Sequence, residues 1–400
     1  MKKNLVSIVK GSNKPSEKEI DASTRKAIGL IGGLSDIISS GNIVLIKPNV
    51  VRAMHPDTGV TTDPRVCKSI ANMVREIGAK PIIVESSSIG TDTEESFKVA
   101  GYRNLRDEGF EVIDLKKEET IKVPIPKGRS LKEVPLPKII IDADVVISVP
   151  SMKTHSQAKV TLSLKNMKGI LSDIFKRKFH LTFGIFQGVA DLCTVIRPAL
   201  SVVDGLVAQE GLGPIDGNRI DMNLIIAGKD PVSVDTITSM IMGFEPGENE
   251  MVNTAVKSGI GIADLNQIEV VGEPISDVKH KFKRADEAMN ELVTIPEGFQ
   301  LILAEKTCTG CRDTVLDILM DMKNQNLLDQ AVGWTIVAGK VDKLPKIDKK
   351  HLLLVGKCAA RFKNYGVFVD GCPPLARNVA GGILRKTPTD ELTFAWRWVT

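Results

Sequence analysis

Short apolar runs alternate with helix-like patterns along the first half of the chain. The apolar runs of strand length lie at residues 42–51, 80–88, 110–115 and 142–150. Residues 63–79 have helical spacing between the first two runs. Asp63 can cap this helix, Pro64 suits its first turn and Gly78 suits its end. This alternation predicts an α/β fold with a largely parallel sheet and helices on both faces.

The pattern also predicts two units of different size. The first covers residues 1–273, and the mixed-charge stretch 274–297 that follows is interpreted as a linker. A smaller α/β unit with the same alternation, which carries most of the cysteines, covers residues 298–400. Within the first unit, a proline- and lysine-rich stretch near 121–138 interrupts the rhythm. We expect this stretch to be a surface insert, either a hairpin or an extended excursion.

Polar side chains follow the predicted strands of the first unit. Lys47 and Asn49 end one strand, and Lys153, Thr154 and His155 end another. Ligands bind at the carboxyl ends of parallel strands, so we expect these side chains to share one edge of the sheet. Lysines there can pair with a carboxylate or phosphate, and histidine titrates near neutral pH. The strand ends therefore predict a site for a small anion, with His155 as the candidate for proton transfer.

Neighbouring loops add further candidates to this site. Thr61 and Thr62 precede a helix start, where free backbone N–H groups and hydroxyls can hold an anion. The stretch TLSLKN adds Thr161, Lys165 and Asn166. Together with the strand-end lysines, these residues predict a cationic patch. A lysine in such a patch can pair with the charge of a substrate or, if it is desolvated, act as a base.

Four of the six cysteines lie in the last hundred residues, each just after a predicted strand: Cys308, Cys311, Cys358 and Cys372. Four thiolates that meet at one edge are the ligand set of an iron–sulfur cluster or of structural zinc. The dispersed spacing, and the proline after Cys372, favour an iron–sulfur cluster, with 4Fe–4S preferred, over zinc. A thiol–disulfide pair of Cys308 and Cys311 is a further alternative.

Composition restricts the partners and the compartment. Aromatic residues make up 4% of the chain and the net charge is +4, with the basic residues spread out, which argues against nucleic acid. No apolar run has the length of a signal peptide's core or of a membrane-spanning helix, so we expect a cytoplasmic protein without a membrane partner. In that compartment Cys67 and Cys193, both on apolar helical patterns, are expected to be buried thiols.

Four motifs occur in order between about Ile43 and Gly272: KPNVV…TTDPRV, VVISVPSMKTHSQAKVTLSLKNMKGI, VVDGLVAQEGLGPIDG and AGKDPVSVDTITSMIMG. Together they resemble the family called domain of unknown function 362. The resemblance implies an α/β domain that is often linked to ferredoxin-type iron–sulfur modules. The compact C-x2-C-x2-C-x3-C-P run of those modules is replaced here by the dispersed CTGC, GKC and GCPP. The resemblance also places Asp204, Gly213 and Asp230 at motif positions.

These patterns predict a cytoplasmic iron–sulfur-binding enzyme that acts on a small anionic metabolite with redox involvement. The catalytic candidates are His155, Lys153 and Lys165. The candidates for substrate binding are Lys47, Asn49, Thr61, Thr62, Thr154, Thr161, Asn166, Asp204, Gly213 and Asp230. Two alternatives stay open: a non-enzymatic electron-transfer or cluster-carrier protein whose polar loops dock a protein partner, and a zinc-stabilised enzyme without redox chemistry.

Overall fold

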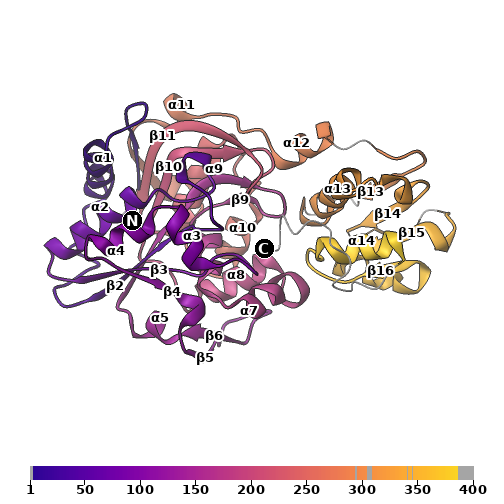
Figure 1. The fold of residues 1–400 in the computed structure, drawn as a ribbon, viewed down its shortest axis with the longest axis horizontal. Coiled ribbons are helices and arrows are strands. Elements are labelled where there is room, and N and C mark those ends of the chain that lie inside the picture. The colour runs from indigo at the N-terminus through magenta and orange to yellow at the C-terminus, as the bar shows by residue number, and fades with distance from the viewer. Residues whose placement is uncertain (1–2, 293–294, 304–308, 340, 345, 386–400) are drawn as a thin grey trace.

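The computed structural model describes residues 3–292, 295–303, 309–339, 341–344 and 346–385. A larger unit carries a ten-stranded sheet, and a smaller unit carries a separate four-stranded sheet (Figure 1). This α/β architecture with a largely parallel main sheet confirms the predicted fold class. The exact boundaries of the two units, placed at residues 273 and 298 from the sequence, stay a prediction.

The large sheet brings together strands from the whole length of the larger unit. They are β1 (Asn4–Lys10), β2 (Ile43–Pro48), β3 (Lys80–Glu85), β4 (Glu111–Asp114), β7 (Val145–Val149), β8 (Ser151–His155), β9 (Lys159–Thr161), β10 (Leu200–Glu210), β11 (Asn218–Gly228) and β12 (Ile268–Gly272). Their order is β12-β1-β11-β10-β7-β2-β3-β4, and β8 pairs with both β10 and β9. The path from β10 through β7, β2 and β3 to β4 is parallel, whereas β11 runs antiparallel to both of its neighbours.

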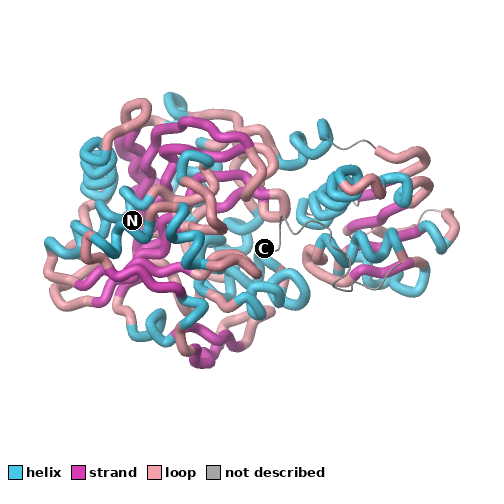
Figure 2. Tube along the Cα trace, viewed as in Figure 1, coloured by secondary structure: helices cyan, strands magenta, loops and turns pink. Residues whose placement is uncertain are grey.

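Helices cover both faces of the large sheet (Figure 2). One face carries α1 (Glu17–Leu30), α2 (Pro64–Glu76), α3 (Thr93–Val99) and α4 (Tyr102–Asp107). The other carries α5 (Lys138–Asp142), α6 (Ser163–Asn166), α7 (Asp173–Lys178), α8 (Ile185–Cys193), α9 (Pro231–Ile241) and α10 (Glu250–Lys257). Within β2, Val44 and Ile46 pack into the first core and Leu45 into the second, because successive side chains of a strand point to opposite faces.

Helix α2 shows how the local sequence sets an element boundary. The Asp63 side chain accepts a hydrogen bond from the Arg65 backbone N–H at 2.9 Å, and Pro64 occupies the first helical position. The helix ends at Glu76, and Gly78 then adopts a φ of +83°. Capping by Asp63 and termination near Gly78 were both predicted and are confirmed.

The stretch near residues 121–138 forms a two-stranded antiparallel hairpin of β5 (Thr120–Pro124) and β6 (Glu133–Pro137). The hairpin, rather than the extended excursion, is therefore the conformation of the insert. Among the helices that the structure describes, none combines the length and the apolar character needed to cross a bilayer.

The smaller unit is a parallel sheet in the order β13-β14-β15-β16 with its own core. Its strands are β13 (Gln300–Leu303), β14 (Thr335–Ala338), β15 (Leu352–Val355) and β16 (Val367–Val369). Helices α13 (Thr309–Asn324) and α14 (Ala376–Leu384) contribute to this core. The chain reaches the smaller unit through α11 (Ile275–Val278) and α12 (Ala285–Leu292), so the predicted linker is partly helical.

Candidate functional site

A cavity of about 180 Å³ lies at the carboxyl ends of the large sheet's parallel strands, where they face the smaller unit. Its wall includes Asn49 after β2, Ser86 after β3 and His155 at the end of β8. The smaller unit adds Leu375 and Arg377 at the start of α14. Ligands of parallel α/β sheets bind at this edge, so the cavity is the candidate site.

Basic side chains outnumber acidic ones on the wall. The basic residues are His155, Lys165, Lys168, Lys176, Arg177 and Arg377, and the acidic residue among the described lining residues is Asp317. Burial lowers the pKa of Lys165, Lys168 and Lys176 to about 7 in each case. A neighbouring lysine charge adds to this effect at Lys165 and Lys168. Amines with such pKa values can both donate and accept protons near neutral pH.

Lys47 lies fully buried behind the cavity wall instead of on it. Its Nζ donates to Glu85 Oε2 and to Asn166 Oδ1, both at 2.9 Å. Asn166 lies on the wall, and its Nδ2 donates to the backbone oxygen of Lys47 at 2.9 Å and to Ser148 Oγ at 3.0 Å. Of these two predicted ligand-binding residues, Asn166 therefore reaches the cavity and Lys47 fixes the orientation of its amide.

The threonine pair before α2 has a similar supporting position. Thr62 Oγ1 donates to the Val149 backbone oxygen at 2.8 Å and accepts from the Asn49 N–H at 2.9 Å, which joins the ends of β7 and β2. Asn49 does lie on the wall, and its Oδ1 is buried with no hydrogen-bond partner among the described residues. Thr61 and Thr62 are buried and are not among the described lining residues.

His155 and Lys165 are the two catalytic candidates that reach the cavity. The Nδ1 atom of His155 accepts the backbone N–H of Gln157 at 3.0 Å and of Ala158 at 3.3 Å. In the neutral ring the proton therefore lies on Nε2. Lys165 Nζ makes a hydrogen bond of 3.5 Å with Thr161 Oγ1, and Thr161 is also on the wall. Both side chains thus border the space in which a ligand would lie.

Lys153, Thr154 and Gly213 lie apart from the described wall. Lys153 is fully buried, its Nζ donates to the Val60 backbone oxygen, and burial lowers its pKa to about 7. Thr154 Oγ1 donates to the Gly211 backbone oxygen at 2.9 Å. A Cβ atom on Gly213 would come within 2.0 Å of the Thr154 backbone oxygen, so a glycine is needed for this close approach.

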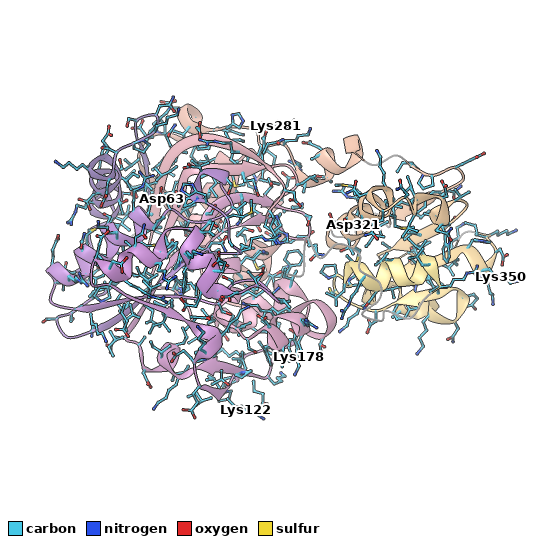
Figure 3. The ribbon with its side chains drawn as sticks, viewed as in Figure 1. Asp63, Lys122, Lys178, Lys281, Asp321 and Lys350 are labelled. Carbon is cyan, nitrogen blue, oxygen red and sulfur yellow. The ribbon has the colours of Figure 1, made fainter. Side chains whose placement is uncertain are left out.

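Asp204 and Asp230 make hydrogen bonds within the fold. Asp204 Oδ2 accepts the Asp63 N–H at 2.7 Å, which ties β10 to the cap of α2 inside the larger unit (Figure 3). Burial, together with the nearby Asp63 charge, raises the pKa of Asp204 to about 7. Asp230 caps α9 through the Ser233 N–H at 2.8 Å and pairs with Arg197 at 2.9 Å. Neither aspartate is among the described lining residues.

Sequence reasoning missed several basic residues of the wall: Lys168, Lys176, Arg177 and Arg377. Lys176 is 4% exposed, and its Nζ donates to Ser86 O and Ser87 O at 2.6 Å and to Ser86 Oγ at 2.7 Å. The basic run FKRKFH could have indicated Lys176 and Arg177. Such a run is more often a solvated helix face, and its burial is set by distant residues.

The predicted cysteine ligands lie partly within the described residues. Cys308 lies outside them. Cys311 is 5% exposed and adjoins the loop after β15, where a Cβ atom on Gly356 would come within 2.7 Å of its Sγ. That loop meets the next one, since the Lys357 N–H donates to the Gly371 backbone oxygen at 2.9 Å. The loops that carry Cys311, Cys358 and Cys372 are thus neighbours.

The described residues contain no group of three or more histidine, cysteine or acidic side chains placed to hold a metal ion. With Cys308 undescribed, the four-cysteine prediction stays a prediction. Cys67 and Cys193 are buried, as expected, and burial raises the pKa of both thiols, to about 12 for Cys193. These two residues are therefore thiols of the core.

Comparison with known proteins finds similarity within the larger unit. A thylakoid-associated protein of Synechocystis sp. is 28% identical over 239 residues, which span 56% of this chain and 70% of that protein. The lactate racemase apoprotein from Thermoanaerobacterium thermosaccharolyticum aligns with a TM-score of 0.39 and 15% identity, over 84% of this chain and 70% of that one. Residues 44–240 match the family described as domain of unknown function (DUF362).

Proposed function

We propose that this chain is an enzyme that acts on a small anionic metabolite, a carboxylate or a phosphate, with an iron–sulfur cluster next to the substrate. The observation that carries the proposal is the cavity at the strand ends, where Lys165, Lys168 and His155 border one space. Largely enclosed pockets with a few convergent polar groups and perturbed pKa values are the usual form of active sites.

The wall provides groups for both binding and proton transfer. Lys165 and Lys168, in their protonated forms, would pair with the negative charge of the metabolite. His155, held by its Nδ1 atom, would exchange a proton with the substrate through Nε2. Lys165 in its neutral form is a second base, because its pKa of about 7 leaves both forms populated near neutral pH.

The position of the cysteine loops supports a redox role. The Ile185 N–H donates to the Cys372 backbone oxygen at 3.2 Å, and Ile185 is also a residue of the cavity wall. A cluster held by Cys308, Cys311, Cys358 and Cys372 would thus lie beside the cavity. Such a cluster supplies one-electron transfer, and 4Fe–4S is the type we favour. Its thiolates require a reducing compartment, for which we propose the cytoplasm.

Metal and sulfide analysis of protein purified without oxygen tests the cluster. We expect iron with matching sulfide and a visible absorption that dithionite bleaches. Replacing Cys372 with Ser should lower the iron content, whereas replacing the core thiol Cys193 with Ser should leave iron bound. Zinc without colour would overturn the redox part and favour the zinc-stabilised enzyme instead, and the absence of any metal would overturn both.

Titration calorimetry with acetate, pyruvate, inorganic phosphate and glycerol phosphate tests the anion site. At least one of these should bind, and Lys165→Met should weaken it about ten- to a hundredfold, the usual worth of a charged hydrogen bond. Lys127→Met, which removes an exposed lysine of the hairpin, is the matched control and should leave binding unchanged. If none of the four anions binds to the unmodified protein, the proposal fails.

The exposure of Cys358 favours a second candidate function. A cluster with one ligand at the surface could be reached by another protein, as in an electron-transfer or cluster-carrier protein. Mixing the loaded protein with apo-ferredoxin distinguishes the two. Transfer of the cluster, together with no anion binding, would favour the carrier, and anion binding with a retained cluster would favour the enzyme.

A further inference from the structure

The cavity wall has an apolar side as well as a basic one. Seven apolar residues contribute to it: Val51, Ile89, Ile185, Pro214, Ile215, Leu375 and Ala376. They come from the loops after β2 and β3, from the start of α8, from the loop between β10 and β11, and from the start of α14. A ligand that fills the cavity must therefore place apolar atoms against these side chains, because buried hydroxyl groups would lose their hydrogen bonds to water.

Not every basic side chain of the cavity wall is available to bind a ligand. Lys176 Nζ already donates to three oxygens at 2.6–2.7 Å, those of Ser86 and Ser87, which satisfies all its donors. Among the described residues, Lys165 makes one hydrogen bond, a long one of 3.5 Å to Thr161, so its ammonium is the better partner for a ligand. Asp317 adds a negative charge from the smaller unit. The basic residues of the wall still outnumber Asp317, and Lys165 is the ammonium best placed to pair with an anion.

The volume of the cavity also favours a small ligand. Its volume is about 180 Å³, below the range of roughly 300–1,000 Å³ that is typical of sites for drug-sized ligands. A nucleotide or a sugar phosphate with a large polar body would not be enclosed, whereas a short-chain acid would be. The apolar wall and the volume, together with the Lys165 ammonium, therefore favour a compact anion with a hydrocarbon body.

We propose that the cavity takes a small carboxylate with an apolar body, with its carboxylate at Lys165 and its hydrocarbon part against Ile215 and Leu375. This inference rests on the proposed anion site and narrows its substrate class. Phosphate and sugar phosphates are then poor ligands of the same site, even though they carry more charge.

Titration calorimetry of the full chain with a matched series of probes tests this inference. Isovalerate should bind more than tenfold more tightly than acetate, since each buried CH₂ contributes about fourfold. Isovaleramide, which has the same shape without the charge, should bind at least tenfold more weakly than isovalerate. Inorganic phosphate and glycerol phosphate should bind more weakly than isovalerate.

The outcomes separate this inference from the function on which it rests. Tighter binding of either phosphate, or equal binding of acetate and isovalerate, would overturn the carboxylate class and leave the anion site in place. Equal binding of isovalerate and isovaleramide would overturn both, because the site would then not recognise charge. Failure of every probe to bind would likewise overturn both.

A pair of leucine variants locates the hydrocarbon part. Leu375 is 9% exposed and lies on the wall, whereas Leu265 is 40% exposed and lies elsewhere in the larger unit. Leu375→Ala should reduce the preference for isovalerate over acetate at least threefold, and Leu265→Ala should leave it unchanged. An unchanged preference in a folded Leu375→Ala variant would overturn the placement of the hydrocarbon part.

Discussion

Lys47 and Glu85 form a buried ion pair behind the cavity wall, with 2.9 Å between Nζ and Oε2. Burial lowers the pKa of the lysine and raises that of the glutamate, and the attraction between the two charges opposes both shifts. A Cβ atom on Gly169, a wall residue, would come within 2.6 Å of both Lys47 Nζ and Glu85 Oε1. The pair therefore lies one residue layer from the ligand space.

The first prediction concerns the stability that this pair provides. Lys47→Met leaves Glu85 without its cation in a buried position, so we expect the free energy of unfolding to fall by about 3–5 kcal/mol. Glu85→Gln should have a similar effect. The double variant should lose less than the sum of the two, because it leaves no buried charge unpaired. Urea unfolding followed by circular dichroism measures all three.

The exposed pair of Lys122 and Glu133 is the control for this cycle. Its atoms are 3.3 Å apart, its side chains are 78% and 62% exposed, and it lies on the hairpin away from the smaller unit (Figure 3). Lys122→Met should change stability by less than about 0.5 kcal/mol, because water and ions screen such pairs. Equal losses for Lys47→Met and Lys122→Met would contradict a structural role of the buried charges.

The second prediction is that anion binding weakens as the pH rises through 7. Burial lowers the pKa of Lys165 to about 7, so the ammonium that pairs with the anion is lost above that pH. Affinity for isovalerate should be highest near pH 6, where its carboxylate is ionised and Lys165 is protonated, and should fall by up to about tenfold per pH unit above pH 7. Calorimetry in buffers of different ionisation enthalpy should also detect proton uptake on binding near pH 7.

Lys165→Arg provides the control for this pH dependence. Arginine stays protonated at these pH values, so the fall in affinity above pH 7 should be reduced. Lys168 also has a pKa of about 7, so its deprotonation accounts for the pH dependence of affinity that remains in Lys165→Arg. An unchanged pH profile in Lys165→Arg would mean that another group controls binding.

The sequence indicated the edge of the sheet where the cavity lies, but not which strand-end residues would face it. Asn49 and Lys47 carry the same signal, a polar residue at the end of β2, yet one lies on the wall and the other is buried. The difference depends on Glu85, which ends the adjacent strand β3 and forms a buried hydrogen bond with the lysine. Such a pairing between residues 38 positions apart has no local pattern.

Local sequence patterns likewise predict only part of the fold. The βαβ rhythm from β2 to β7 could be predicted because each strand and helix has its own local period. The long antiparallel pairing of β10 with β11, and of β11 with β1, could not. Val6 of β1 pairs with Gly228 of β11, far along the chain, so the pairing depends on tertiary contacts. Arg377 reaches the cavity for a similar reason, through docking of the smaller unit.

The third prediction separates a structural from a ligand-binding role for Asp204. Its pKa is raised to about 7, chiefly by burial. Between about pH 4 and pH 7 the folded protein therefore keeps a proton that the unfolded chain has lost, so stability should fall as the pH rises through this interval. Asp204→Asn should remove this slope, of up to about 1.4 kcal/mol per pH unit, as measured by urea unfolding.

The same variant should also lower stability near pH 4, where the original carboxyl group is protonated, by about 1–3 kcal/mol. The carboxyl group accepts the N–H groups of Asp63 and Leu206, and an amide can accept only one of them. Affinity for isovalerate should stay within about twofold of the original, because Asp204 is not among the described lining residues. A large loss of affinity at unchanged stability would restore Asp204 as a ligand-binding residue.

The fourth prediction concerns Gly213, where a Cβ atom would come within 2.0 Å of the Thr154 backbone oxygen. Gly213→Ala should lower the free energy of unfolding by about 1–3 kcal/mol, the usual cost of overpacking. It should also weaken isovalerate binding, because Pro214 and Ile215 on the wall follow directly. Gly29→Ala is the control: nothing lies within 4 Å of its Cβ position in α1, so stability should rise slightly. If Gly213→Ala changed neither stability nor isovalerate binding, this loop would relax freely around the added methyl group and would not determine the position of the cavity wall.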